Sequence, residues 1–322
     1  MPTRAIRCPA KLNLTLAVGP PDRSAAGRGR HPVVSLMVAL DFGDTLQVKP
    51  LPVHADRGRL GKSAGTWFRA WADDAPHKPQ IDWPLESDLL VRAHAAVQAA
   101  GGAALPVDAT LYKRVPPGTG LGGGSADAAA MLHFLETHLA EHDAQPGIDF
   151  GAIAAGLGAD VSFAWHALRH PGRPAALATG FGETLEPLAL PTSLHAALVF
   201  PDFGCPTAAV YAAFDAYHPD APPIDVEPAR RAIRQLQAGA TLADVELFND
   251  LTAAAQGAQP KLAPLFESLR DAGLRPQLTG SGAAVFLPAR DAVHAAELAG
   301  QAKRVAGHPA RPVRTIDPEL RS

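Results

Sequence analysis

The segment PPGTGLGGGSADAAAML, residues 116–132, restricts the fold more than any other part of this sequence. It places five glycines in the seven positions 118–124 and then continues as good helix-forming sequence. Glycine costs roughly 1 kcal/mol relative to alanine where the backbone is ordered, so such a loop needs a physical reason. The preceding VDATLYKRV, residues 107–115, predicts a strand. Strand, glycines and helix in this order are typical of a phosphate-binding loop, because phosphate can approach the free N–H groups of a helix N-terminus.

Several nucleotide-binding patterns share this outline, and a flexible surface loop is the alternative to all of them. The Walker pattern fails, because Ser125 follows Gly124 without the required lysine. Residues 118–123 match G-x-G-x-x-G, but the acid at the dinucleotide-binding spacing, Glu141, falls at a predicted helix end instead of a strand tip. An NAD-dependent oxidoreductase is therefore the weaker alternative. A third interpretation uses Ser125 and Asp127 at the helix start, where a hydroxyl can bind a phosphate oxygen or a Mg²⁺-bound ligand, although Ser125 could also be a plain N-cap.

Composition limits the possible classes of protein. The 322 residues suggest two domains, and 47% hydrophobic with 19% charged residues is ordinary for a folded chain with a sizeable core. A net charge of −3 gives no general attraction to nucleic acid. Only two cysteines, Cys8 and Cys205, argue against a disulfide framework, and we find neither a membrane span nor a secretory signal. We expect a cytoplasmic protein that binds neither nucleic acid nor membrane; its oligomeric state is not predicted.

The first 50 residues predict strands. AKLNLTLAV, residues 10–18, alternates strictly and predicts a half-buried strand with Lys11 and Asn13 on its polar face. Residues 32–42 and 44–50 predict two strands around a turn at Gly43. Later segments alternate helix and strand without a regular βαβ rhythm, and residues 55–84 look irregular, so we expect an α+β fold. Helices are predicted over residues 87–102, 126–140, 150–157, 207–217, 227–239, 261–273 and 291–307. The first of them has Ser87 or Asp88 as its N-cap and Gly101 at its end.

Three separated segments together resemble the motifs of the GHMP small-molecule kinases. PAKLNLTL (9–16) is similar to the first motif, residues 116–132 to the ATP-binding second motif, and LTGSGAAVF (278–286) to the third. They lie in the right order over nearly the whole chain. The resemblance implies a two-domain α+β fold, with an N-terminal ATP-binding domain like domain 2 of ribosomal protein S5 over residues 1–182. A ferredoxin-like C-terminal domain would cover residues 183–322, in agreement with a composition shift near 180–192.

Within this family, GADVSF (158–163), FND (248–250) and the first two motifs are most similar to a particular group of members. Those kinases phosphorylate the 2-hydroxyl of a CDP-linked sugar alcohol in the non-mevalonate route to isopentenyl diphosphate. Two positions depart from their pattern: Arg30 stands where tyrosine is usual, and Asp88 where asparagine is usual near the adenine. The alternatives are a kinase of another small alcohol, such as homoserine or mevalonate, and a non-catalytic nucleotide-binding homologue.

The resemblance implies two catalytic residues. Asp160 matches the catalytic base, and Lys11 matches the lysine that keeps this acid ionised and polarises the substrate hydroxyl. The structural alternatives are a turn aspartate that caps a backbone N–H and a solvated lysine. Mg²⁺ would accompany ATP, largely hydrated and near Ser125, without a dedicated set of protein ligands.

The resemblance also implies the binding residues. ATP would contact Pro116, Gly118, Gly120, Leu121, Gly122, Gly123, Gly124, Ser125 and Ala126. The CDP-linked substrate would contact Asn13, His31 (cytosine hydrogen bonds), Tyr211 (stacking on the base), Gly280, Ser281 and Gly282. The third motif could instead be only a bulged strand. Two histidine pairs with i,i+4 spacing, His138/His142 and His166/His170, are interpreted as solvated, because zinc would need further ligands.

Overall fold

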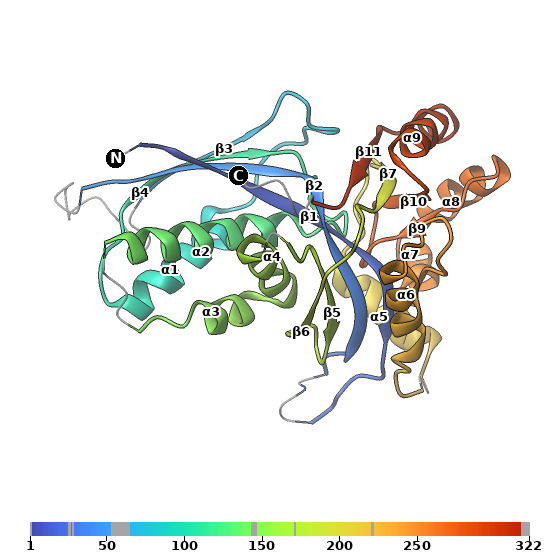
Figure 1. Cartoon of the computed structure of the whole chain (residues 1–322), viewed down its shortest axis with the longest axis horizontal. Helices are drawn as coiled ribbons and strands as arrows, with labels where there is room; N and C mark the ends of the chain where they lie inside the picture. The colour runs from blue at the N-terminus through green and yellow to red at the C-terminus, as the bar shows by residue number, and fades with distance from the viewer. Residues whose placement is uncertain are drawn as a thin grey trace. The chain divides into compact units, whose positions relative to one another are not determined.

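The structure, a computed structural model, describes residues 2–24, 27, 29–52, 65–142, 147–170, 172–219 and 222–316 (Figure 1). The chain forms two compact units, each built from separate stretches of sequence. Unit 1 comprises Met1–Ala10, Gly43–Pro116 and Gly122–Arg169, and unit 2 comprises Lys11–Phe42, Pro117–Leu121 and His170–Ser322. The domain boundary between residues 182 and 183 stays a prediction.

Unit 1 consists of strands covered by helices. Strand β2 (Val33–Pro50) pairs antiparallel with β4 (Val107–Lys113), which pairs parallel with β3 (Gly65–Trp71). Alternate residues of β4 are buried, as expected for a strand with helices on one face. Figure 1 shows the helices gathered beside these strands. They are η1 (Leu85–Ser87), α1 (Leu89–Gly101), α2 (Gly123–Glu141), α3 (Phe150–Leu157) and α4 (Ala159–Arg169).

Local sequence signals explain where the unit 1 helices begin and end. The Asp88 carboxylate accepts a hydrogen bond from the backbone N–H of Leu90, so it is the N-cap of α1, and Gly102 ends the helix with a φ of 63°. In the same way Asp149 caps α3 by accepting from the N–H of Ala152. Leucine, phenylalanine and small alanine side chains of α2 fill the core against α1 and α4. Asp88, one of the two predicted N-caps of α1, is therefore confirmed, whereas the helix ends one residue later than predicted, since Gly101 is its last residue and Gly102 its C-cap.

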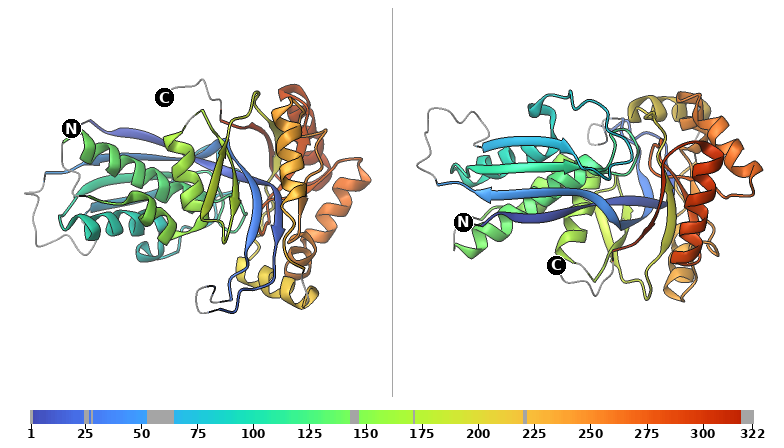
Figure 2. Two further views of the ribbon diagram at one scale, coloured as in Figure 1. Left: turned by 60° about the horizontal axis from the view of Figure 1, so that its bottom comes forward. Right: turned by 90° about the horizontal axis from the view of Figure 1, so that it is seen from above.

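Part of unit 2 is ferredoxin-like. Four antiparallel strands lie in the order β11-β7-β10-β9, although their chain order is β7, β9, β10, β11. Figure 2 shows this part of the chain, coloured yellow to red, in two further views. Helix α9 packs against β7, β10 and β11, and α5 packs on α7. This strand order and the β-α-β-β-α-β succession confirm the predicted fold. The bounds are β7 (His195–Val199), α5 (Thr207–Tyr217), α6 (Glu227–Gln237), α7 (Thr252–Ala258), α8 (Leu262–Asp271), β9 (Gln277–Leu278), β10 (Val285–Ala289), α9 (Ala292–Ala306) and β11 (Ala310–Arg314).

The remaining strands of unit 2 pair around the first two strands of the chain. Strand β1 (Arg4–Val18) pairs parallel with the short β8 (Phe248–Asn249). The first half of β2 pairs antiparallel with β5 (Ala175–Thr179), which pairs with β6 (Thr184–Leu188). These pairings place the FND segment beside the first motif.

The predicted turn at Gly43 is wrong. Residues 33–50 form one continuous strand, β2, and Gly43 lies inside it. A Cβ atom at Gly43 would stand 2.0 Å from the carbonyl oxygen of Cys8, so glycine is needed there for a close approach of two backbones. A glycine between two strand-like segments can indicate either a turn or a close approach of two backbones, and only the position of the neighbouring strand distinguishes these alternatives.

The half-buried interpretation of the first strand is also wrong. Every residue from Cys8 to Val18 is buried, including Lys11 and Asn13, each 5% exposed. The strict alternation was real, but the polar face is covered by other polar groups instead of water.

Three further boundaries differ from the prediction. Residues 65–71 of the segment expected to be irregular form β3, while residues 53–64 lie outside the described residues. Helix α2 begins at Gly123, three residues before the predicted start at residue 126, and Asp160 lies in the first turn of α4 instead of a turn. Within the described residues, no helix is both long and apolar enough to cross a bilayer.

Two glycine substitutions should have opposite effects on stability. We expect Gly43→Ala to lower the free energy of unfolding by about 2–4 kcal/mol, because the new methyl group overlaps the Cys8 carbonyl. The matched control is Gly156→Ala in α3, where a Cβ meets nothing within 4 Å, and we expect a gain of about 0.5–1 kcal/mol. Urea unfolding followed by circular dichroism measures both. An unchanged Gly43→Ala variant would refute the close approach.

Candidate active site

The polar face of β1 carries a continuous hydrogen-bond network in unit 2. The Lys11 ammonium donates to the Asn13 side-chain oxygen. The Asn13 amide in turn donates to the Ser35 hydroxyl at 2.8 Å, and Ser35 donates to the carbonyl oxygen of Thr15 at 2.7 Å. This network explains why the polar face can be buried, since buried polar groups need partners. It fixes the positions of Lys11 and Asn13.

The third motif forms a tight loop against this network. It connects β9 to β10, which pair antiparallel as a hairpin, so the bulged-strand interpretation is wrong. The Thr279 hydroxyl accepts from the backbone N–H of Asn13 at 3.0 Å. A Cβ at Gly280 would lie 3.2 Å from the Lys11 Nζ atom and 3.4 Å from the Asn13 Oδ1 atom. The missing side chain at Gly280 therefore lets the loop backbone approach both residues.

The first part of the glycine loop, residues 117–121, joins the same assembly. The Gly118 carbonyl accepts from the N–H groups of Cys205 and Ala283, each at 3.0 Å. A Cβ at Gly120 would stand 2.1 Å from the carbonyl oxygen of Thr279, and its φ of 73° also excludes most side chains. Leu121 accepts from the backbone N–H of Lys11 at 3.0 Å. All three motifs thus meet within unit 2.

The second part of the glycine loop begins helix α2 in unit 1. Gly122 is the N-cap, with a φ of 70° and no side chain to satisfy the first N–H groups. Ser125 stands inside the first turn and is half-buried, so it is not the N-cap. Gly123 is closely packed, because a Cβ there would lie 2.8 Å from the Val115 side chain, whereas Gly124 is exposed. The helix therefore starts with backbone donors and no side-chain acceptor at its cap.

A buried ionic cluster in unit 1 ties this helix start to two strands. The Lys113 ammonium donates to Asp127 at 2.6 Å and also to Asp44. Asp44 additionally accepts from the backbone N–H groups of Arg114 and Val115, the latter at 2.8 Å. The three charged side chains are at most 5% exposed. Asp127 is thus engaged inside the fold as a partner of Lys113, while the predicted phosphate or Mg²⁺ contact of the Ser125 hydroxyl stays a prediction.

The cluster shifts the ionisation of its members. Burial raises the pKa of Asp127 well above its usual value of 3.8; Lys113 opposes this rise, and Asp44 adds to it. Burial alone would lower the pKa of Lys113, but Asp127 and Asp44 together raise it. Lys113 therefore stays charged, while one lysine must balance two acids in a site that water does not reach.

The two predicted catalytic residues lie in different units. Lys11 belongs to unit 2, and Asp160 belongs to unit 1, where α4 packs against α2. Asp160 is half-buried in the first turn of α4, where the helix dipole favours a carboxylate. The pairing of these two residues stays a prediction.

The residues predicted for the cytosine come together in unit 2. The His31 ring lies 5.1 Å from the Tyr211 ring and 5.8 Å from the Phe214 ring, between centroids. Its Nδ1–H donates to the Gly19 carbonyl at 2.8 Å, and its Nε2 atom lies 3.4 Å from Asp215. The guanidinium of the neighbouring Arg30 lies 4.1 Å from the Phe181 ring centroid.

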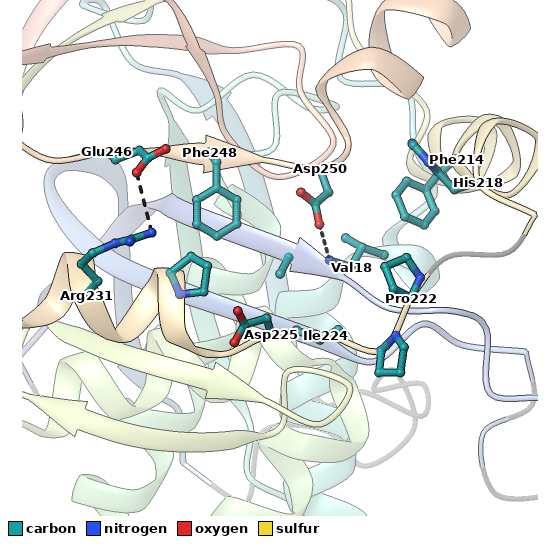
Figure 3. Close-up of a pocket in the computed structure, with 13 residues that line it drawn as sticks. Val18, Phe214, His218, Pro222, Ile224, Asp225, Arg231, Glu246, Phe248 and Asp250 are labelled. Atoms are coloured by element: carbon teal, nitrogen blue, oxygen red, sulfur yellow. Dashed lines mark hydrogen bonds and ion pairs between the residues drawn. The ribbon is translucent and has the colours of Figure 1, made fainter.

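Unit 2 also contains a cavity of about 620 Å³ beside the end of β1 (Figure 3). Phe214, Phe248 and Ile224 give it apolar walls, while Asp250 and Arg231 lie at its edges. The Asp250 carboxylate accepts from the backbone N–H of Val18 at 3.0 Å. None of the site residues predicted above is among the residues that line this cavity.

Comparison with known proteins decides the family. A family model described as the GHMP kinases N terminal domain matches residues 88–167. A 4-diphosphocytidyl-2-C-methyl-D-erythritol kinase of Caulobacter vibrioides is 37% identical over 283 residues, which cover 86% of this chain and 87% of that protein. The enzyme of the same name from Nocardioides sp. (strain ATCC BAA-499 / JS614) is 36% identical over 94% of each chain. The chain belongs to the 4-diphosphocytidyl-2-C-methyl-D-erythritol kinases of the GHMP family.

Solved structures agree with this assignment. A crystal structure of 4-(cytidine 5'-diphospho)-2C-methyl-D-erythritol kinase covers 98% of this kinase at a TM-score of 0.70 and 29% identity. A homoserine kinase from Cytophaga hutchinsonii has a TM-score of 0.59 but only 15% identity, and this likeness shows the fold alone.

Two residues that position the kinase's motifs were missed by the sequence analysis. Asn249 donates through its side-chain amide to the carbonyls of Leu278 and Gly280, at 2.9 and 2.8 Å, and so holds the third motif. Thr279 is fully buried and bonds the first motif. Both lie in segments that carry the family resemblance, FND and LTGSGAAVF, which was the available signal.

The ionic cluster should be critical for the stability of the kinase. We expect Lys113→Met to lower the free energy of unfolding by about 3–5 kcal/mol, because it leaves Asp44 and Asp127 buried without a counter-charge. Asp127→Asn is the matched variant, since the amide keeps an acceptor for Lys113 and removes one buried charge. Urea unfolding at pH 7 should show a small change or a gain for Asp127→Asn.

The same pair of proteins tests the ionisation of the cluster. The folded state holds the Asp127 proton more tightly than the unfolded state, so wild-type stability should fall relative to Asp127→Asn as pH rises above about 4. Unfolding curves of both proteins between pH 4.5 and 7.5 measure the difference. A difference that is independent of pH would contradict the raised pKa of Asp127.

Proposed function

We propose that this kinase transfers the γ-phosphate of ATP to the 2-hydroxyl of 4-diphosphocytidyl-2-C-methyl-D-erythritol, in non-mevalonate isopentenyl diphosphate biosynthesis. The observation that carries the proposal is the 33–37% identity with kinases of this name over most of the chain. Kinases of homoserine and mevalonate share the fold at 15% identity or less in the structures compared, which supports no shared substrate.

The glycine loop is the proposed binding site for the ATP phosphates. Phosphoryl transfer depends mainly on positioning and on stabilising negative charge. The free N–H groups at the start of α2 supply donors and the positive end of the helix dipole. Because Gly122 carries no capping side chain, a phosphate can occupy the place of the cap. The same role is proposed for the whole set, which is Pro116, Gly118, Gly120, Leu121, Gly122, Gly123, Gly124, Ser125 and Ala126.

Asp160 is the proposed catalytic base, with Lys11 as its partner. A carboxylate within reach of the substrate 2-hydroxyl accepts its proton as the oxygen attacks the γ-phosphate. A lysine beside both groups favours the ionised carboxylate and polarises the hydroxyl. The burial of Lys11 supports this role, because a buried ammonium acts in a low-dielectric setting, where its field is stronger.

Mg²⁺ is proposed to bind together with ATP. The described residues fit this ion in one respect: the Ser125 hydroxyl is half-buried in the first turn of α2 and not used as a cap. Asp127 does not fit, because it is committed to Lys113. When bound, Mg²⁺ would neutralise charge on the phosphate oxygens, largely through its retained waters.

The cytidine end of the substrate is proposed to contact His31 and Tyr211, which already lie ring to ring. Asn13 would bond the sugar alcohol, together with Gly280, Ser281 and Gly282. The Ser281 hydroxyl is 2.9 Å from the Thr207 hydroxyl, which holds this part of the third motif in place.

A cytoplasmic location is also proposed, in agreement with two free, buried cysteines.

Replacing the proposed base should separate chemistry from binding. We expect Asp160→Asn to lower turnover by roughly 10²–10⁴-fold while ATP affinity changes little, because the amide keeps the shape but cannot accept the proton. Coupled ADP release and equilibrium dialysis with ATP measure the two effects. Asp149→Asn is the control, since asparagine caps α3 as well as aspartate does and turnover should not change. Full activity of Asp160→Asn would remove this residue from the proposed role.

A substrate panel tests the function as a whole. We expect ADP release with 4-diphosphocytidyl-2-C-methyl-D-erythritol and none above background with homoserine or mevalonate. A site built to hydrogen-bond a substrate group rejects analogues that lack it strongly, by roughly 10⁴-fold or more. Turnover with only a substrate that lacks cytidine would overturn the proposed substrate, and ATP binding without any turnover would favour a non-catalytic homologue.

A further inference from the structure

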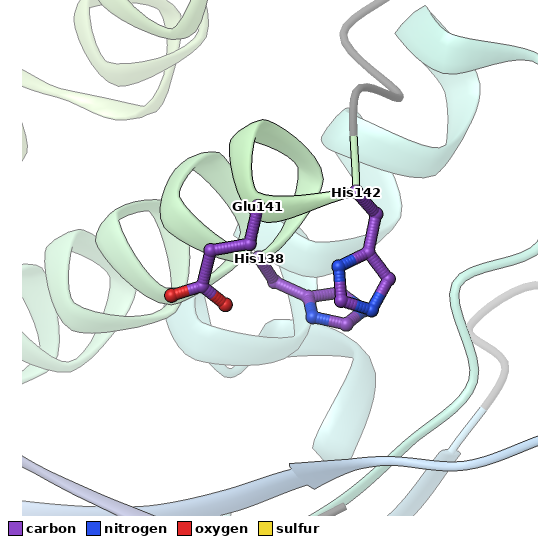
Figure 4. Close-up of side chains that lie close together, drawn as sticks. All are labelled: His138, Glu141 and His142. Atoms are coloured by element: carbon purple, nitrogen blue, oxygen red, sulfur yellow. The ribbon is translucent and has the colours of Figure 1, made fainter.

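The C-terminal end of α2 carries three side chains suited to binding a metal ion. His138, Glu141 and His142 each offer a ligand atom, and these atoms all lie within 4.8 Å of one another. Figure 4 shows the three side chains leaving the last turn of the helix, with the two imidazole rings close together. Among the described residues this is the one group of three or more such side chains that meets this distance limit.

We propose that His138, Glu141 and His142 form a binding site for a divalent transition-metal cation such as Zn²⁺. The site has no part in the proposed phosphoryl transfer, since α2 contributes its opposite end to the phosphate loop. Two imidazoles and one carboxylate are ligands that Zn²⁺ and its neighbours prefer over Mg²⁺ or Ca²⁺. The histidine pair alone offers two ligands, and the fold adds the Glu141 carboxylate as a third.

Helix geometry supplies the arrangement. Residues three and four apart lie on the same face of a helix, so His138 is adjacent to both Glu141 and His142. The ring centroids of the two histidines are 4.6 Å apart. The His138 ring also stacks on the Phe134 ring, with an angle of 1° between their planes, which limits its rotation. One ligand of the site is therefore held in place before a metal binds.

The movement needed for binding is small. In a tetrahedral zinc site with metal–ligand bonds of about 2.1 Å, the ligand atoms lie roughly 3.4 Å apart. Closing from 4.8 Å requires only side-chain rotation at a helix end where Glu141 and His142 are exposed. The remaining coordination position would take water. The C-terminal end of a helix, with its unpaired carbonyls, also favours a cation.

One neighbouring group opposes the metal. Arg4 forms an ion pair with Glu141, with side chains 38% and 43% exposed. The guanidinium both occupies the carboxylate and repels a cation. Exposed ion pairs contribute little to stability, so a metal that gains two imidazoles and this carboxylate can displace Arg4. Replacing Arg4 should therefore raise the affinity for the metal, whereas replacing any of the three ligands should lower it.

The test is competition between the purified full-length chain and a chromophoric chelator for Zn²⁺. We expect saturable binding of one Zn²⁺ per chain, weakened by more than roughly tenfold in His138→Ala and in His142→Ala. Glu141→Gln should weaken binding to a smaller extent. Arg4→Ala should tighten binding by roughly two- to fivefold, because it releases the carboxylate. The matched control is His170→Ala, which removes the other histidine pair of the same spacing and should leave the affinity unchanged.

A second measurement keeps the result independent of folding. Zinc should raise the unfolding temperature of the wild type but not that of the His138→Ala/His142→Ala double variant, whose unfolding temperature without zinc should match the wild type. Binding that survives in the double variant would overturn the proposal. Binding that weakens in Arg4→Ala, or that is lost in His170→Ala, would overturn it equally.

Discussion

The contact between the backbone of Gly120 and the carbonyl of Thr279 constrains the rest of the site. There is no room for a Cβ between them, so the glycine loop can lie on the third motif only if residue 120 is glycine. Next to this contact, the Leu121 carbonyl accepts a hydrogen bond from the backbone N–H of Lys11, and the Thr279 hydroxyl accepts one from the backbone N–H of Asn13. Main-chain atoms therefore join the first motif to the glycine loop, and the Thr279 hydroxyl joins the first motif to a segment 266 residues away.

A second constraint acts at the start of α2. The site in unit 2 is held by hydrogen bonds, whereas the helix start in unit 1 is held by a lysine between two carboxylates. A charged cluster of this kind is costly to bury and even more costly to break, which favours one arrangement of strand, loop and helix over others. The backbone donors at the start of α2, the proposed phosphate site, are thus oriented by groups buried beneath them.

Much of the fold could be predicted from the sequence because its signals are local. The Asp88 cap, the glycine after α1 and the strand before the glycine loop are all determined by neighbours in sequence. The errors concern long-range contacts. Gly43 looked like a turn because its partner, Cys8, lies 35 positions earlier in the chain, and the polar face of β1 looked solvent-exposed because its cover, Thr279, lies far along the chain. The partners of Asp127 were hidden for the same reason, since only the fold brings Lys113 and Asp44 together beside it. The role of Asn249 is visible only in the fold, where its side-chain amide donates to two carbonyls of the third motif.

The chain changes from one unit to the other after residues 10, 42, 116, 121 and 169. A gene fragment that ends at any single site therefore encodes an incomplete version of at least one unit. No single cut in the chain therefore separates two complete units. In evolution, loops and surface helices of such a protein can be exchanged, but neither unit can readily be transferred to another protein as one continuous segment.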